Sequence, residues 1–483
     1  MGETVGMCKL DLLPSERGRF FCATPAISTV TFFELTPDDV QSHRKGGENI
    51  NNNEKRKAMN AVIQYFKNKV DAILDANPWL RSDLRYDANK DMAAYYPESR
   101  QMDKKQYFEL RNDISLNYPE CLYRYEEIGR LLKPTLCKSS DDAIGRSAPL
   151  FKVTLVPCCS RKEKESDDDE EEEEEEDGKC SPHQSNQDYS HVALVLSGNH
   201  SLLDGYSLYM LYNMLSIDQP IRSLNATRKQ EIPDKIIKAL KSEKSFVDEA
   251  NTGFIIKYIF KSMLNKFFFP QAESRIFYIN ETWVHDAKKK TLASISDNEG
   301  ESVSPVSTND VLVSEISKGM QNDGSDLEVI MAVNFRNRIE NCTNDDVGNY
   351  ENCITYKAAD FATASLIRKS LSGEYYFRAS KPVTKRWSIF EAFWGKSKIG
   401  LLSNWSKFPV TLKLHDNVAK EVLHLPLFDN SGAPVSVANG AVIFRPTANK
   451  TALFIFGDKA FVEYVNDAEF VEKPCIAESS RAV

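Results

Sequence analysis

The residues best suited to chemistry in this sequence lie in the stretch Ser197 to Tyr206, which reads S-G-N-H-S-L-L-D-G-Y. His200 and Asp204 are four positions apart, and Gly205 follows directly. A histidine can take up a proton near neutral pH, because its unperturbed pKa is about 6.5. The carboxylate can orient the imidazole or fix the loop, and the glycine permits positive φ or close packing. The alternative is a purely structural loop histidine, with Asp204 as a helix cap.

The flanking residues predict a strand, a tight loop that holds His200, and a helix. The apolar run H-V-A-L-V-L (191–196) precedes the loop, and a helical pattern (207–215) follows it. We expect residues 150–156 to form a neighbouring strand. The polar insert 160–190 separates these two strands and contains eleven consecutive acidic residues (167–177). Like charges repel one another and resist burial, so we expect this insert to be disordered and to serve as a spacer.

Composition favours a soluble globular protein with two domains. The chain has 483 residues, which is long for a single core, with 41% hydrophobic and 27% charged residues. Its net charge of −9 is more than accounted for by the acidic run. The remainder is therefore nearly neutral, which would not repel an anionic substrate, and nothing suggests a nucleic-acid partner. The ten cysteines show no disulfide framework, which favours a reducing, cytoplasmic location.

No metal site and no membrane-spanning segment is expected. Cys158, Cys159, Cys180 and His183 do not have the spacing of a common zinc site. The N-terminal residues lack the pattern of a signal segment. The stretch Phe254 to Phe269 repeats lysines and asparagine every four residues between apolar ones. It is typical of a helix on a membrane surface or of a crossover helix between two domains, and we favour the crossover helix.

Further motifs follow the histidine loop in a fixed order. A capped helix start, S-P-V-S-T-N-D-V-L (304–312), precedes a buried strand (327–333), and that strand runs into N-F-R-N-R (334–338). Gly348-Asn349-Tyr350 comes next, followed by I-G-L-L-S-N-W-S-K-F-P (399–409).

Together with H-x-x-x-D-G at mid-chain, these motifs resemble those of the CoA-dependent acyltransferase superfamily, which includes BAHD and alcohol acyltransferases and peptide-synthetase condensation domains. The resemblance implies an α/β (α+β) architecture of two chloramphenicol acetyltransferase-like domains, each a mixed sheet flanked by helices, with a substrate tunnel between them. We place the domains at 1–235 and 273–483, joined by an amphipathic linker (236–272). The stretch F-D-N-S-G-A-P (428–434) departs from the D-F-G-W-G-K-P motif of BAHD proteins.

The resemblance also implies roles for individual residues. His200 would be the general base, while Arg336 would pair with Asp204 and, with Gly205, support the loop. Hydrogen-bond donors are carried by Ser403, Asn404 and Trp405. In the family the corresponding strand faces the reacting carbonyl, which implies that Asn404 or Trp405 would bind the oxyanion. The alternative is that Trp405 is a core residue.

We therefore expect an acyltransferase that moves an acyl group from acyl-CoA, as co-substrate, to a small alcohol or amine. No metal or permanently bound cofactor is implied, and we expect activity to rise with pH through the neutral range. The protein is expected to be a cytoplasmic monomer, with peripheral contact to an intracellular membrane as an option for 254–269. The alternatives are a condensation-type enzyme fed by a carrier protein, and a non-catalytic relative that binds acyl-CoA or a protein partner.

Overall fold

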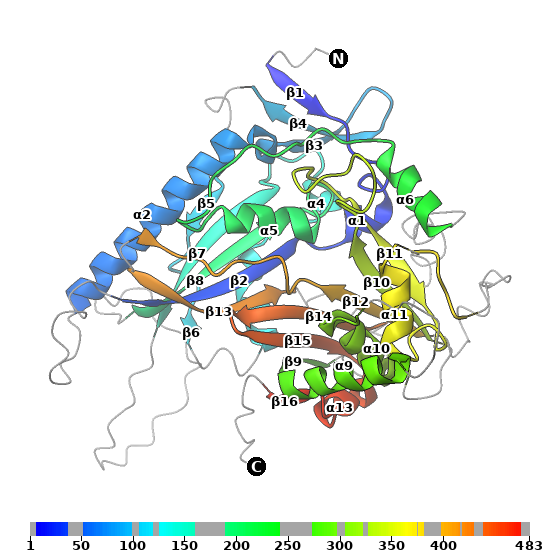
Figure 1. Ribbon diagram of the computed structural model, residues 1–483. Coiled ribbons are helices and arrows are strands. Elements are labelled where there is room, and N and C mark those ends of the chain that lie inside the picture. The colour runs from blue at the N-terminus through cyan, green and yellow to red at the C-terminus, as the bar shows by residue number, and fades with distance from the viewer. Residues whose placement is uncertain are drawn as a thin grey trace, which may run out of the picture.

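The computed structural model describes residues 6–36, 52–98, 106–118, 125–159, 189–241, 273–296, 305–321, 327–373, 375–380, 398–415, 418–428 and 438–474. Two large mixed β-sheets, each with helices packed against it, dominate the molecule (Figure 1). This arrangement is the predicted α/β architecture. The acidic insert, the stretch 254–269 and most of the stretch 428–434 lie outside the described residues.

The first sheet carries the histidine loop and has the strand order β13-β2-β8-β7-β5, with β6 also paired to β7. Its central strands are β2 (Ile27–Leu35), β8 (Tyr189–Gly198) and β7 (Phe151–Cys159), and both neighbours of β8 run antiparallel to it. The short strands β5 (Phe108–Leu110) and β6 (Leu116–Asn117) run parallel to β7. The predicted neighbouring strands are thus confirmed.

Strand β13 (Ala419–Leu427) joins this sheet from the second half of the sequence. It pairs antiparallel with β2, for example Leu425 opposite Val30. The expected division of the chain at residues 235 and 273 did not include this placement of β13. The apolar pattern of a strand does not indicate which sheet the strand will join.

The second sheet has the order β11-β10-β12-β14-β15-β9-β16, in which β12 runs parallel to both of its neighbours. Its strands are β9 (Glu273–Ile279), β10 (Leu327–Asn334), β11 (Glu351–Tyr356), β12 (Lys398–Asn404), β14 (Ala438–Thr447), β15 (Lys450–Gly457) and β16 (Val471–Pro474). The predicted strand at 327–333 is confirmed, and β14 and β15 form an antiparallel hairpin.

A small third sheet, β1-β4-β3, consists of Met7–Leu10, Met92–Pro97 and Asp83–Tyr86. The helices that pack on the first sheet include α2 (Asn52–Ala76) and α5 (Gly205–Asn213), whereas α10 (Thr308–Met320) and α13 (Lys459–Asn466) pack on the second. The remaining helices are α1 (Arg19–Ala23), α3 (Tyr125–Leu132), α4 (Ser140–Ala143), α6 (Ile232–Leu240), α9 (Glu281–Ser296) and α11 (Ala364–Leu371), with 3₁₀ turns η2 (Pro78–Arg81) and η5 (Lys133–Thr135).

Local signals set several of these boundaries. Helix α2 ends before Asn77-Pro78, because the residue before proline disfavours the helical conformation. Ser307 caps α10 in a reciprocal capping box with Asp310. Strand β9 ends at Ile279, shortly before α9 begins at Glu281, and α11 begins at Ala364 behind its cap Thr363.

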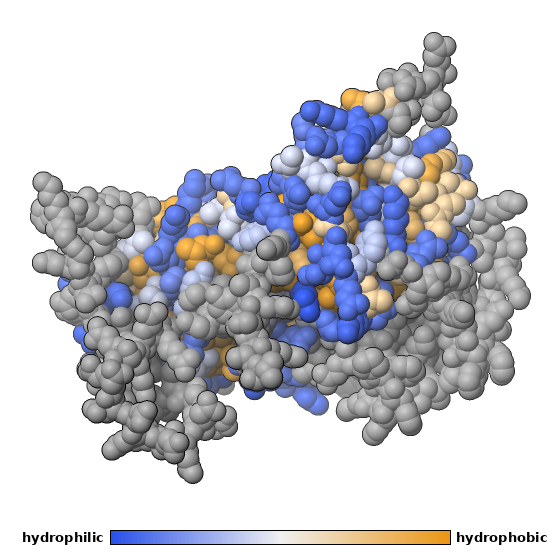
Figure 2. Space-filling view, turned by 90° about the horizontal axis from the view of Figure 1, so that it is seen from below, coloured by the Kyte–Doolittle hydropathy of each residue, from blue (hydrophilic) through white to orange (hydrophobic). Residues whose placement is uncertain are grey.

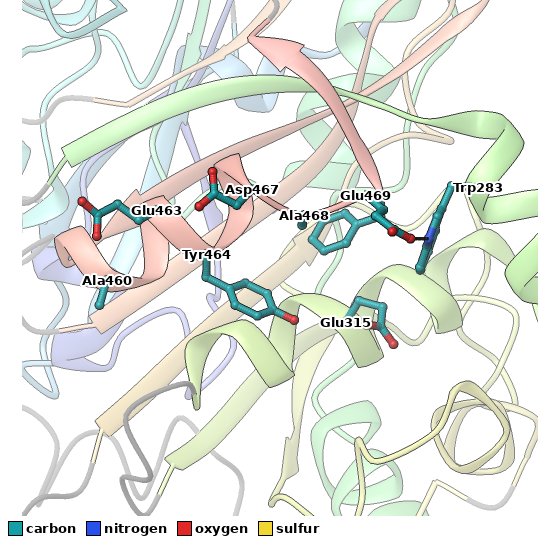
Figure 3. A pocket seen from close by; sticks show the side chains of 9 residues that line it. Trp283, Glu315, Ala460, Glu463, Tyr464, Asp467, Ala468 and Glu469 are labelled. Atoms are coloured by element: carbon teal, nitrogen blue, oxygen red, sulfur yellow. Dashed lines mark hydrogen bonds between the residues drawn. The ribbon is translucent and has the colours of Figure 1, made fainter.

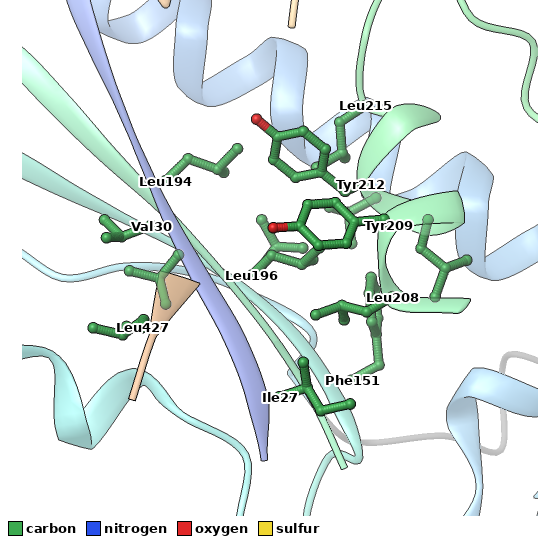
Figure 4. Close-up of a cluster of buried hydrophobic side chains, with 14 of the residues drawn as sticks. Ile27, Val30, Phe151, Leu194, Leu196, Leu208, Tyr209, Tyr212, Leu215 and Leu427 are labelled. Carbon is green, nitrogen blue, oxygen red and sulfur yellow. The ribbon is translucent and has the colours of Figure 1, made fainter. Parts of the chain in front are cut away.

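The histidine loop rests on the larger of two apolar cores. Figure 4 shows Leu194 and Leu196 of the first sheet on the side of Tyr209 and Tyr212 of α5, and Val30 and Leu427 on the opposite face of the sheet. This core continues to inward-facing residues of β14 and β15, such as Phe444 and Phe454. The second core fills the opposite face of the second sheet, beneath α10 and α13. Burying these side chains stabilises the elements that carry the loop, by about 1.5–3 kcal/mol for each large apolar side chain.

The described surface intersperses hydrophilic and apolar residues, as the view from below shows (Figure 2). Large apolar side chains that are exposed among the described residues are scattered: Tyr86, Leu110, Ile217, Leu292 and Tyr376. None of the described helices is long and apolar enough to cross a membrane.

Candidate functional site

The histidine loop is a short turn between the end of β8 at Gly198 and the start of α5 at Gly205. The side chain of Asn199 organises its first half. The Asn199 Oδ1 atom accepts hydrogen bonds from the Ser201 main chain (3.0 Å) and from the Ser140 hydroxyl (2.8 Å), and Nδ2 donates to the Lys138 carbonyl (2.9 Å). The loop is therefore fixed to α4 before it reaches α5.

Asp204 fixes the second half of the loop. It is the N-cap of α5, where its Oδ1 atom accepts the Ser207 main-chain N–H at 2.8 Å. Its Oδ2 atom accepts from Arg336 Nη1 at 2.7 Å, and Arg336 Nη2 donates to Oδ1 at 3.2 Å. The Asp204 side chain is 1% exposed and the Arg336 side chain is 0% exposed. This two-point geometry is the strong form of an arginine–carboxylate pair.

The other guanidinium hydrogens of Arg336 are also engaged. Nη2 donates to the Gly348 carbonyl (2.7 Å), Nε donates to the Asp346 carbonyl (2.7 Å), and the guanidinium lies 4.8 Å from the centre of the Tyr206 ring. The buried charge is thereby compensated by hydrogen bonds as well as by Asp204. Arg336 lies two residues after the end of β10, so this arginine connects the histidine loop of the first sheet to the second sheet.

His200 lies in the middle of the turn, with its ring centre 4.6 Å from that of Phe21. Burial lowers the pKa of His200 below its usual value, and smaller influences from its own main chain, Asp204 and Asn349 raise it. The imidazole is therefore neutral at pH 7. Its Nδ1 atom is buried and has no hydrogen-bond partner among the described residues.

The side chains of the predicted oxyanion residues point in two different directions. Trp405 is 9% exposed, and its Nε1 atom would lie 3.5 Å from a Cβ built on Gly205, which places the indole against the start of α5. The indole N–H donates to the Ser403 hydroxyl at 2.9 Å. Asn404, by contrast, donates from Nδ2 to Asn309 Oδ1 of α10 at 2.8 Å. The structure thus brings Trp405 and Ser403 to the loop and turns the Asn404 amide toward α10.

A second buried network was not found from the sequence. Glu16 and Arg228 form an ion pair at 2.9 Å, both side chains 0% exposed, and Glu16 also accepts the Asn349 main-chain N–H at 2.8 Å. Neither charged residue belongs to a motif that marks it as buried. The only signal was Gly348-Asn349, and Gly348 takes φ +124°, where a Cβ would lie 2.8 Å from Arg228 Nε.

A cavity of about 420 Å³ opens beside α5. Tyr206 and Tyr209 form its helical side, and Phe408 and Val410 form the opposite side. A second cavity, of about 580 Å³, lies among α9, α10 and α13 (Figure 3). Its lining includes Trp283 and Glu469, which are hydrogen-bonded at 3.3 Å, and no residue of the histidine loop. The cavity beside α5 reaches Tyr206 at the end of the histidine loop, but His200, Ser403 and Trp405 line neither of these two cavities.

No group of three or more histidine, cysteine, aspartate or glutamate side chains suited to hold a metal occurs among the described residues. The chemistry available at the site is that of a neutral imidazole, a fixed ion pair and a few neutral donors. Such a set suits proton transfer to and from a reacting group.

Comparison with solved structures identifies the fold. The structure is similar to TRI101 from F. graminearum complexed with coenzyme A and T-2 mycotoxin, with a TM-score of 0.59, 13% identity, and coverage of 96% of this chain and 98% of that one.

It is also similar to polyketide synthase associated protein 5 from Mycobacterium tuberculosis (TM-score 0.51, 11% identity, 96% and 97% coverage). The first condensation domain of the calcium-dependent antibiotic synthetase matches with a TM-score of 0.52, 9% identity, and 95% and 94% coverage. No protein-family model and no curated protein sequence matched the chain. The chain thus has the two-domain chloramphenicol acetyltransferase-like fold implied by its resemblance to the CoA-dependent acyltransferase superfamily.

Proposed function

We propose that the protein transfers an acyl group from acyl-CoA to an alcohol or amine, with His200 as the general base. The observation that carries this proposal is the environment of His200. The imidazole is held neutral by burial, and its loop is fixed by the fully engaged pair of Asp204 and Arg336. A base that is already deprotonated and already positioned at pH 7 is what proton abstraction from a weakly acidic acceptor requires.

In the proposed reaction, one histidine moves one proton in two steps. The acceptor oxygen or nitrogen attacks the thioester carbonyl while His200 takes the acceptor proton. The tetrahedral intermediate then collapses, the carbon–sulfur bond breaks, and the imidazolium returns the proton to the leaving thiolate of CoA. Asp204 takes no part in the transfer, because its oxygens are occupied by Arg336 and the Ser207 main chain.

Ser403 and Trp405 are the residues we assign to the oxyanion. Ser403 accepts the indole N–H through its oxygen, so its own hydroxyl hydrogen is not used in that contact and can be donated to a developing negative charge. Asn404 is the weaker candidate of the three, because its amide hydrogen-bonds Asn309 and Ser406.

The substrate classes are supported by the fold, and a cavity beside α5 begins at Tyr206, next to the histidine loop. A structure with this fold binds coenzyme A together with T-2 mycotoxin, and we extend that pairing of a CoA donor with a small-molecule acceptor to this chain. The cavity of about 420 Å³ is within the range of small-molecule sites. We further propose that the protein acts as a cytoplasmic monomer without a metal or resident cofactor, with peripheral membrane contact through 254–269 as a secondary possibility.

A donor exchange tests the proposal against a condensation-type activity, which the likeness to a condensation domain favours as second candidate. Purified protein is incubated with a panel of acyl-CoAs, or with the same acyl groups on a separate carrier protein, and with mixed alcohols and amines. Acceptor-dependent release of CoA supports the proposal, and product only from acyl-carrier supports the second candidate. No product with either donor contradicts both and favours a non-catalytic relative.

A further inference from the structure

The histidine loop is held from a second side by the buried pair of Glu16 and Arg228. Arg228 Nη2 donates to the Leu202 carbonyl at 2.7 Å, and Nη1 donates to the Val347 carbonyl at 2.9 Å. Leu202 belongs to the histidine loop and Val347 to the turn that precedes β11. The pair thus links these two segments, through hydrogen bonds other than those of the pair formed by Asp204 and Arg336.

Asn349 extends this network to His200. Its Nδ2 group donates to Glu16 Oε1 at 3.2 Å and to the His200 carbonyl at 2.8 Å. Both partners are acceptors, so the amide orientation is fixed by chemistry: the flipped amide would direct its oxygen at two other oxygens. The side chain of Asn349 is buried, at 4% residue exposure.

This orientation leaves two complementary atoms without partners. Asn349 Oδ1 and His200 Nδ1 are both buried, and neither has a hydrogen-bond partner among the described residues. A buried polar atom without a partner costs about 1–3 kcal/mol. The imidazole of a neutral histidine carries one N–H, and Oδ1 can only accept. A hydrogen bond from Nδ1–H to Oδ1 would satisfy both atoms at once, and the Asn349 side chain is already near enough to the imidazole to raise the pKa of His200.

We propose that Asn349 is a positioning residue, which accepts a hydrogen bond from Nδ1–H of His200 and is itself held in place by Glu16 and Arg228. This contact fixes the proton on Nδ1 and leaves the lone pair on Nε2 as the base. The role as base rests on the proposed function, whereas the hydrogen bond itself does not. The residue that orients the imidazole is then a neutral amide, and Asp204 serves only the ion pair and the helix cap.

The direct test is the protonation pattern of the His200 ring in the unmodified protein. Ring ¹⁵N shifts of histidine-labelled protein report which nitrogen carries the proton, and the His200→Ala spectrum assigns the signal. The expected result is a neutral ring protonated on Nδ1. A neutral ring protonated on Nε2 overturns the proposal, and this outcome depends on no variant and no activity.

Asn349→Ala supplies the second readout. The expected result is a shift of the His200 ring toward protonation on Nε2, together with a fall in kcat on the order of tenfold or more and a KM changed less than twofold. Asn439→Ala is the matched control, since Asn439 is a buried asparagine that hydrogen-bonds Asp458 instead of the histidine loop. An unchanged His200 spectrum in folded Asn349→Ala protein overturns the proposal. Absence of acyl transfer in the unmodified protein would contradict the proposed function and leave the spectral test intact.

Discussion

At the scale of single residues, the site is defined by how completely its charges are neutralised. Asp204, Arg336, Glu16 and Arg228 have side chains no more than 1% exposed, and each lies in a hydrogen-bonded ion pair. Removing one member of such a pair leaves the other charge buried and uncompensated, which costs far more than the pair itself contributes. The function we assign to these residues is to hold the loop of His200 in one conformation.

Asp204→Ala and Arg336→Ala are each expected to lower the free energy of unfolding by about 3–5 kcal/mol, because each leaves an unpaired buried charge. The double variant should lose clearly less than the sum of the two. Urea unfolding of the three variants measures this, with Asp218→Ala as the control, since its partner Lys413 is 66% exposed and exposed pairs contribute about 1 kcal/mol or less. Strictly additive losses would show that the two residues do not stabilise each other.

At the scale of secondary structure, β13 is joined to its neighbours by a buried polar cluster. His424 of β13 shares hydrogen bonds with Tyr209 of α5 (2.9 Å) and with Thr31 of β2 (2.9 Å). Burial lowers the pKa of His424 to about 3. Glu421, on the same strand, accepts the Leu412 main-chain N–H at 2.6 Å, and burial raises the pKa of its carboxyl to about 7.

These two groups impose opposite pH dependences on stability. The unfolded chain binds a proton on His424 below pH 6.5 and the folded chain does not until about pH 3, so this contribution to stability falls as pH decreases across that window. Glu421 keeps its proton in the folded state up to about pH 7, so its contribution falls as pH rises between roughly 4.3 and 7.

His424→Asn should therefore flatten the loss of stability on the acid side. The difference in unfolding free energy between the unmodified protein and the variant is expected to shrink by about 1.4 kcal/mol per pH unit between pH 6 and pH 4. Urea unfolding across this range measures it, with His285→Asn as control because the His285 side chain is 65% exposed. A difference that stays constant with pH would mean that His424 titrates normally in the folded protein.

Much of the region around the loop was predictable from the sequence because its signals are local. The apolar run of β8 and the helical pattern of α5 are short-range patterns that occur as expected, and the helix cap at Asp204 had been stated as the alternative role of that residue. The partners Glu16 and Arg228 were missed because their burial depends on segments that meet only in the folded chain. The orientation of the Asn404 amide away from the loop was also missed, because it depends on the position of its partner Asn309 on α10.

At the scale of the whole molecule, the two sheets are not formed from separate halves of the sequence. Strand β13 covers the edge of β2 in the first sheet but lies between β12 and β14 in the sequence. Arg336 then connects the end of β10 to the histidine loop. The candidate site is therefore assembled from both halves of the chain, and its geometry depends on their joining.

A fragment comprising residues 1–242 is expected to be insoluble or to lack a cooperative unfolding transition, because it exposes the edge of β2 and part of its apolar core. Addition of a synthetic peptide with residues 417–428 should increase soluble, folded material by restoring the missing strand. Circular dichroism and soluble yield report the outcome, with a peptide carrying His424→Asp and Leu425→Asp as the control. A fragment that folds cooperatively without the peptide would contradict this account of the first sheet.

The central claim is that His200 is the base for acyl transfer, and CoA release by purified protein with and without His200→Ala tests it most directly. CoA is quantified by chromatography, since ten cysteines would react with a thiol reagent. His191→Ala, which alters a histidine of β8, the strand that precedes the loop, is the control. We predict acceptor-dependent release that falls about 10²- to 10⁴-fold in His200→Ala and persists in His191→Ala. Because burial lowers the pKa of His200, kcat/KM should rise with pH around a midpoint below 6.5, lower than the neutral range expected from the sequence. Acceptor-dependent release that is unchanged in His200→Ala would contradict the assignment of the base.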